Sequence, residues 1–129
     1  MFRRILLVVA ALALALPFGA PARSTKTTLK GSVGPGFTIS LKKVSGVKVK
    51  TLSRGVYVFS VTDRAPDHNF QITGPGIVKA GKAVRTVAIT TVGFVGTKKP
   101  PTTLTLKKGT YTFYCLPHRL DMRGTFKVT

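Results

Sequence analysis

The chain has 129 residues, of which 21 are lysine or arginine and only three are acidic, so its formal net charge is +18. This length suits one domain with one core and leaves no room for a second. So positive a chain favours anionic partners such as an acidic protein, an anionic membrane or a wall polymer. Nucleic acid is not expected as a partner, because residues 1–22 predict a protein outside the cytoplasm.

Residues 1–22 are typical of a secretory signal peptide. Arg3 and Arg4 form a cationic head, an apolar run follows over 5–16, and the small residues at 20–22 suit cleavage after residue 22. The apolar run is too short to span a bilayer comfortably. We therefore expect export to the periplasm, the cell surface or the extracellular space, with about 107 residues and a net charge of about +16 remaining.

The exported part is predicted to be an all-β domain. Residues 23–34 are rich in Ser, Thr, Lys and Gly and predict a flexible lead-in, so the domain is expected to span 35–129. Beyond Pro35 the apolar residues alternate with period two, as in half-buried strands, and no stretch keeps helical spacing. About seven to eight short strands separated by Gly- and Pro-rich turns favour a two-sheet Greek-key sandwich. We expect a monomer.

The strands are predicted from this alternation in chain order. The segment 56–61 is apolar on both faces, which predicts a central strand. The segment 47–50 carries Lys48 and Lys50 between valines, which suits an edge strand. The remaining candidates are 37–42, 68–73, 84–92, 102–106, 110–115 and 124–129.

Two residues with metal-binding side chains are predicted to point inward at strand ends. His68 shares a strand face with Phe70 and Ile72, whose apolar side chains indicate the buried face. Cys115 likewise shares a face with two aromatic residues and is the last residue before a loop. Both side chains should therefore face the interior at strand ends.

The soft metal ligands of the exported chain are concentrated in one short segment. Cys115 is the only cysteine, so an intramolecular disulfide is excluded in a compartment where disulfides would form. His118 and Met122 follow it within the segment 115–122, and His68 is the only other histidine. A thiolate with two imidazoles and a weak thioether is the arrangement that suits copper cycling between Cu(I) and Cu(II). The sequence therefore predicts a site for one copper ion.

Two motifs carry a family resemblance. The segments 114–118 (Tyr-Cys-Leu-Pro-His) and 122–128 (Met-Arg-Gly-Thr-Phe-Lys-Val) resemble the carboxy-terminal signature of plastocyanins and amicyanins, which are cupredoxins, or type 1 blue copper proteins. The segment 67–70 (Asp-His-Asn-Phe) resembles their upstream ligand segment. Three residues separate His118 from Met122, whereas plastocyanins usually have four and amicyanins two.

The resemblance implies roles for six residues of these motifs. His68, Cys115 and His118 would be the strong copper ligands, and Met122 would be the axial ligand. Asn69 would tie the two ligand segments together near the sulfur. Pro117 has no N–H to donate to the thiolate, and hydrogen bonding at that sulfur is one control on the reduction potential.

The predicted function is that of a small exported blue copper protein that passes single electrons between redox partners, one of which should have an acidic docking surface. Two alternatives stay open: a copper chaperone or buffer, and a non-redox basic sandwich that binds anionic surface polymers. Zinc is the second choice of metal, because cysteine and histidine also bind zinc. Catalysis is not expected, since both histidines are used as ligands and no third remains to act as a base.

Overall fold

A computed structural model describes residues 18–21 and 25–129. These residues contain no helix, which confirms the all-β prediction, and form ten strands: β1 (Thr27–Val33), β2 (Ile39–Lys43), β3 (Thr51–Leu52), β4 (Gly55–Asp63), β5 (Gln71–Lys79), β6 (Lys82–Ala88), β7 (Gly96–Thr97), β8 (Thr102–Leu106), β9 (Gly109–Tyr114) and β10 (Arg123–Val128). In this part of the chain, no helix is long and apolar enough to cross a membrane. The predicted signal peptide, 1–22, lies outside the described residues except for 18–21.

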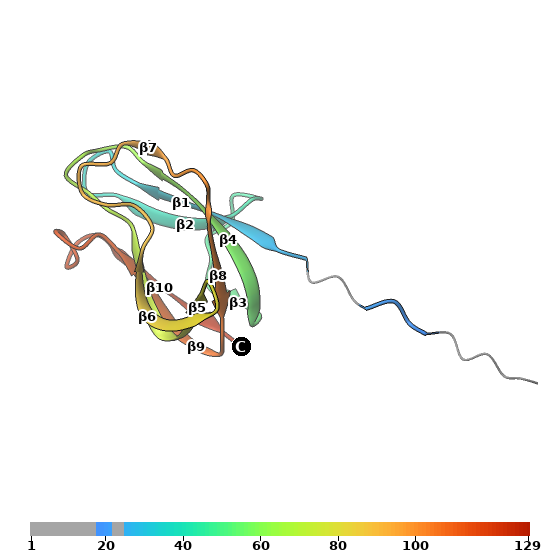
Figure 1. Cartoon of the computed structure of the whole chain (residues 1–129). Helices are drawn as coiled ribbons and strands as arrows, with labels where there is room; N and C mark the ends of the chain where they lie inside the picture. Colours follow the sequence, from blue (N-terminus) through green and yellow to red (C-terminus); the bar gives the residue numbers. More distant parts are fainter. Residues whose placement is uncertain (1–17, 22–24) are drawn as a thin grey trace, which may run out of the picture.

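The strands form one hydrogen-bonded sheet that curls round a common interior (Figure 1). Its order is β2-β1-β4-β8-β5-β9-β10-β3, with β6 paired to β5 and β7 paired to β4. The two predicted layers are present as the two halves of this sheet, and β5 joins them by pairing with β8 at Ile77 and Val78. The number of strands exceeds the predicted seven to eight partly because it includes β3 and β7, which have only two residues each.

The predicted flexible lead-in at 23–34 is wrong for residues 27–33, which form β1. This strand pairs antiparallel with β2 and parallel with β4, and the side chains of Leu29 and Val33 are fully buried. Its outer face is polar, because Thr28, Lys30 and Ser32 alternate with the buried residues. With only two large apolar residues, the period-two pattern was too sparse to distinguish a strand from a polar linker.

Three other strand predictions need correction, and the strand expected at 84–92 ends at Ala88. The segment 47–50 makes only an isolated bridge, between Lys42 and Lys48, and Val47 is 60% exposed while Val49 is buried. The strand expected at 68–73 begins at Gln71, so His68 lies in the loop that precedes β5. His68 still shares the interior with Phe70, as its position in the sequence predicted.

Two stacked aromatic pairs link the ligand-bearing segments to the core. The rings of Phe70 and Phe113 are stacked with centroids 5.8 Å apart. Phe70 follows His68 by two residues and Phe113 precedes Cys115 by two, so this pair joins the segments that carry the two candidate ligands. Behind it, Tyr111 stacks on Phe126 at 5.4 Å. Stacked aromatic pairs stabilise a core beyond the burial of their area, so these two pairs support the segments that carry the candidate ligands.

The replacement Leu29→Ala tests whether β1 belongs to the core. Deleting a fully buried leucine side chain should lower the free energy of unfolding by about 2–5 kcal/mol. Lys30→Ala, on the exposed face of the same strand, is the matched control and should change it by no more than about 0.5 kcal/mol. Urea denaturation followed by circular dichroism measures both, and equal effects of the two replacements would contradict a buried β1.

Candidate metal centre

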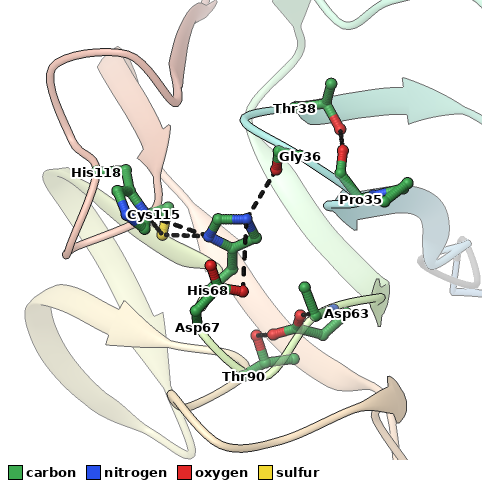
Figure 2. A network of polar contacts seen from close by, with 10 residues as sticks. Pro35, Gly36, Thr38, Asp63, Asp67, His68, Thr90, Cys115 and His118 are labelled. Carbon is green, nitrogen blue, oxygen red and sulfur yellow. Dashed lines mark hydrogen bonds and ion pairs between the residues drawn. The ribbon is translucent and has the colours of Figure 1, made fainter.

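Three side chains converge on one point beyond the ends of β4 and β9 (Figure 2). The ligand atoms of His68, Cys115 and His118 all lie within 4.8 Å of one another. The two Nδ1 atoms are 3.1 Å apart, and each lies 3.7 Å from the sulfur of Cys115. His68 comes from the loop between β4 and β5, and the other two come from the segment 115–122, between β9 and β10.

The segment 115–122 is closed at its base by backbone hydrogen bonds. The N–H of Cys115 donates to the carbonyl of Met122 at 3.0 Å, which extends the β9–β10 ladder by one pair. The N–H groups of Asp121 and Met122 both donate to the carbonyl of His118, at 3.1 and 2.8 Å. Met122 is fully buried under this turn. We call this segment the copper loop.

A hydrogen bond selects the tautomer of His68. Its Nε2 lies 2.7 Å from the carbonyl oxygen of Gly36. Because a carbonyl can only accept, Nε2 carries the proton, and the neutral ring then presents the lone pair of Nδ1. That lone pair points at Cys115 and His118 (Figure 2). Metal-binding histidines are commonly oriented in this way by a partner at their other nitrogen.

The turn 34–38 contacts both imidazole rings, and this contribution was missed by sequence reasoning. The ring of Phe37 meets that of His118 edge-on, with centroids 4.9 Å apart, and lies 6.1 Å from that of His68. The turn is tight, since Gly34 donates to the carbonyl of Thr38 at 2.8 Å and Gly36 has a φ of 64°. A glycine-rich turn was visible in the sequence, but nothing there indicated which ring its aromatic residue would touch.

The remaining residues named by the resemblance also lie at this centre. The side-chain oxygen of Asn69 accepts a hydrogen bond from the backbone N–H of Leu116 at 2.7 Å. This bond joins the His68 segment to the residue after Cys115. Pro117 is exposed on the copper loop, between Leu116 and His118.

A buried relay supports the segment that carries His68. The N–H of Phe70 donates to the hydroxyl of Thr90 at 2.8 Å. This hydroxyl donates to the carboxylate of Asp63 at 2.9 Å (Figure 2). The second oxygen of that carboxylate accepts from the N–H of Ala65 at 3.3 Å. Burial raises the pKa of Asp63 above its ordinary value, and the two hydrogen bonds oppose this rise. The relay ties the end of β4 to both ends of the loop that holds His68.

The spacing of the donor atoms fits a single metal ion. Metal–nitrogen distances of about 2.0–2.1 Å and metal–sulfur distances of about 2.3 Å are found in zinc sites with these ligands, so one ion can bridge two nitrogens up to about 4 Å apart. The observed 3.1 and 3.7 Å separations satisfy that limit. One thiolate with two imidazoles is the donor set of a type 1 copper site, whereas structural zinc sites have four strong ligands.

The sequence profile described as "Copper binding proteins, plastocyanin/azurin family" matches residues 33–129. The chain belongs to this family of cupredoxins. The cupredoxin assignment made from the two motifs is thereby confirmed. The prediction of one copper ion is also confirmed, because the cluster of His68, Cys115 and His118, together with the buried Met122, fits a single type 1 site.

Comparisons with single proteins are more distant. Rusticyanin from Thiobacillus ferrooxidans is 23% identical, with 79% of this chain and 76% of that chain covered and a TM-score of 0.45. A multicopper oxidase from Pediococcus acidilactici is 13% identical, with 92% and 29% covered and a TM-score of 0.42. Another multicopper oxidase is 13% identical, with 83% and 45% covered and a TM-score of 0.43. No curated protein sequence matches the cupredoxin significantly.

The raised pKa of Asp63 predicts a pH-dependent contribution to stability. In the folded cupredoxin the carboxyl keeps its proton at a pH where the unfolded chain, with a pKa of about 3.9, has lost it. The stabilising contribution is therefore complete below about pH 4 and is lost as the pH rises through the folded pKa. Asp63→Asn removes this titration. Urea denaturation between about pH 3.5 and 7 measures the free energy of unfolding of both metal-free proteins. The value for the variant should rise relative to that of the wild type as the pH rises, and a constant difference would contradict the assignment.

Proposed function

We propose that this cupredoxin is an exported carrier of single electrons. His68, Cys115 and His118 would be the strong ligands of one copper ion and Met122 the weak axial ligand. The observation that carries the proposal is the convergence of one sulfur and two Nδ1 atoms at 3.1–3.7 Å from one another. Copper supplies a Cu(I)/Cu(II) couple there, in which the thiolate suits the reduced ion and the imidazoles suit both.

The stiffness of the ligand frame supports electron transfer. The copper loop is closed by backbone hydrogen bonds, the His68 ring is held by Gly36, and Asn69 ties the two ligand segments together. Ligands held in this way move little when the charge of the ion changes, so the reorganisation energy of electron transfer is small. The sulfur of Cys115 is fully buried, so a competing chelator has poor access to it. This burial favours an electron carrier over a copper buffer or chaperone.

The surroundings of His118 support one exit for the electron. His118 is the half-exposed member of the ligand set, whereas the other three are buried. Around it, Phe37, Leu116 and Leu120 are 63%, 49% and 80% exposed. Exposed apolar groups gathered around a polar centre are typical of an interaction site. The edge of the His118 imidazole would therefore be the port, and this apolar surface would meet the redox partner.

Export and the absence of catalysis complete the proposal. The cationic head and apolar run of residues 1–22 favour a signal peptide. The two histidines of the sequence are both assigned to the metal, which leaves none to act as a general base or to bind a second metal. The partner would be an acidic redox protein, because the positive charge of the chain favours association with an anionic surface.

Copper loading tests the ligand assignment directly. Adding one equivalent of Cu(II) to the metal-free protein should produce an intense blue absorption from thiolate-to-copper charge transfer. Cys115→Ser should bind Cu(II) without the blue band, because the thiolate is gone. Ser53→Ala, the control, should keep the blue band. Visible absorption and repeated cycles of reduction and reoxidation measure both properties. A colourless wild-type protein, or copper lost within a few cycles, would contradict the proposed function.

Electron self-exchange tests the port at His118. Leu120→Gln removes apolar contact beside the imidazole without changing the charge, so it should slow self-exchange by roughly fivefold or more while leaving the blue band unchanged. Val44→Gln, at an exposed valine in the turn after β2, is the control. NMR line broadening of mixed Cu(I) and Cu(II) protein in about 1 M salt, which screens the like charges, gives the rate. Equal rates for the two variants would place the port elsewhere.

A further inference from the structure

A hollow with two arginines lies beside the copper loop, on the outer face of β5, β9 and β10. Its volume is about 430 Å³. The residues that line it are Thr73, Thr112, Tyr114, Arg119, Leu120 and Arg123. We call it the basic hollow.

The sheet register brings the lining side chains together. Tyr114 lies directly opposite Arg123 on β10 and opposite Gln71 on β5, and Thr112 lies opposite Thr73. Side chains directly opposite on neighbouring strands have Cβ atoms about 4.5–5.5 Å apart on one face. Tyr114 must face outward, because its neighbours Phe113 and Cys115 are buried. Tyr114 is half-buried and lines the hollow, and Arg119 reaches it from the copper loop.

Neither arginine of the basic hollow is neutralised within the described chain. Both are exposed, and among residues 18–21 and 25–129 the only contact of ion-pair type is the 3.8 Å approach of Asp67 to Nε2 of His68, which involves neither arginine. Asp63 is buried in its relay. Asp121 is exposed on the copper loop, but it does not line the hollow. Two guanidinium groups therefore share one concave surface with no acidic residue in its lining.

The chemistry of the lining selects the ligand. A guanidinium presents a planar fork of donors that matches a carboxylate, and charge-assisted bonds of this kind are stronger than neutral ones. The exposed side chain of Leu120 adds an apolar rim that the basic hollow shares with the surface around His118. A free inorganic anion would have no use for that rim, whereas an acidic protein surface carries both carboxylates and apolar contacts.

We propose that the basic hollow docks paired carboxylates of an acidic redox partner and so orients that partner over His118. This inference rests on the proposed electron-transfer function. Docked carboxylates would lie beside the copper loop, where Leu120, two residues after His118, lines the hollow. Charge attraction then acts at long range, and apolar contact acts only once the partner is oriented.

The test compares two double variants of the copper-loaded protein that remove the same charge. Arg119→Gln/Arg123→Gln empties the basic hollow, and Lys79→Gln/Lys82→Gln removes two cations from the β5–β6 hairpin, where these lysines face each other. The probe is a hexaglutamate peptide with blocked ends, added to the diamagnetic Cu(I) form at low salt. Two-dimensional NMR gives the affinity and the residues affected.

The peptide should shift resonances of residues 112–123 and Thr73, and the arginine double variant should bind it about tenfold more weakly. The lysine double variant should lose no more than about twofold. Equal losses in the two variants would overturn the proposal, because binding would then follow net charge alone. Binding of a polyuronate but not of the peptide at these residues would also overturn it, since the occupant would be an anionic polymer.

A kinetic measurement separates this proposal from the proposed function. Ferricyanide, a trianion, oxidises Cu(I) to Cu(II) and is itself reduced to ferrocyanide by the one electron transferred. The hexaglutamate peptide should slow this reaction for the wild-type protein and not for the arginine double variant. Both double variants should keep the blue band and the redox cycling. Loss of peptide binding with intact cycling leaves the proposed function standing, whereas peptide binding without cycling contradicts that function alone.

Discussion

The centre depends on the closure of the copper loop onto the β9–β10 ladder. The pair formed by Cys115 and Met122 continues the register of Tyr114 with Arg123, so the sulfur is positioned by the sheet itself. The loop then turns back through bonds to the carbonyl of His118. A side chain placed by a closed ladder has little freedom to follow a change in the charge of a bound ion. The remaining ligand candidate has to be brought to this fixed point from elsewhere in the chain.

Three separate supports bring His68 there. Gly36 holds its Nε2, Asn69 ties its segment to Leu116, and the relay through Thr90 anchors the loop on both sides. These supports come from the turn before β2, from the ligand segment itself and from the stretch after β6. The metal centre is therefore a property of the whole curled sheet and not of the copper loop alone. The stacked Phe70 and Phe113 give these segments a shared base.

Two surfaces adjoin the copper loop and have different physical roles. The apolar residues around His118 act only at contact, because burial of apolar area has no long range. The arginines of the basic hollow act over about a Debye length, roughly 10 Å at 0.1 M salt, and can orient an acidic surface before contact. Leu120 borders both surfaces, so a partner held in the basic hollow would lie beside the imidazole port.

By itself the sequence determined the all-β class, the family and the chemistry of the centre, because these follow from local alternation and from ligand types within short motifs. It also indicated that Cys115 faces inward, since strand parity is a local property, and His68 is buried as predicted although it lies in a loop before β5. Only the tertiary structure decided that 27–33 is a strand, because its two large buried side chains are covered only when the segment pairs with β2 and β4. The contacts of Phe37 with His118 and of Gly36 with His68 join positions distant in the chain. The same is true of the basic hollow, where the register of three strands brings Arg123 and the two threonines together and the copper loop adds Arg119.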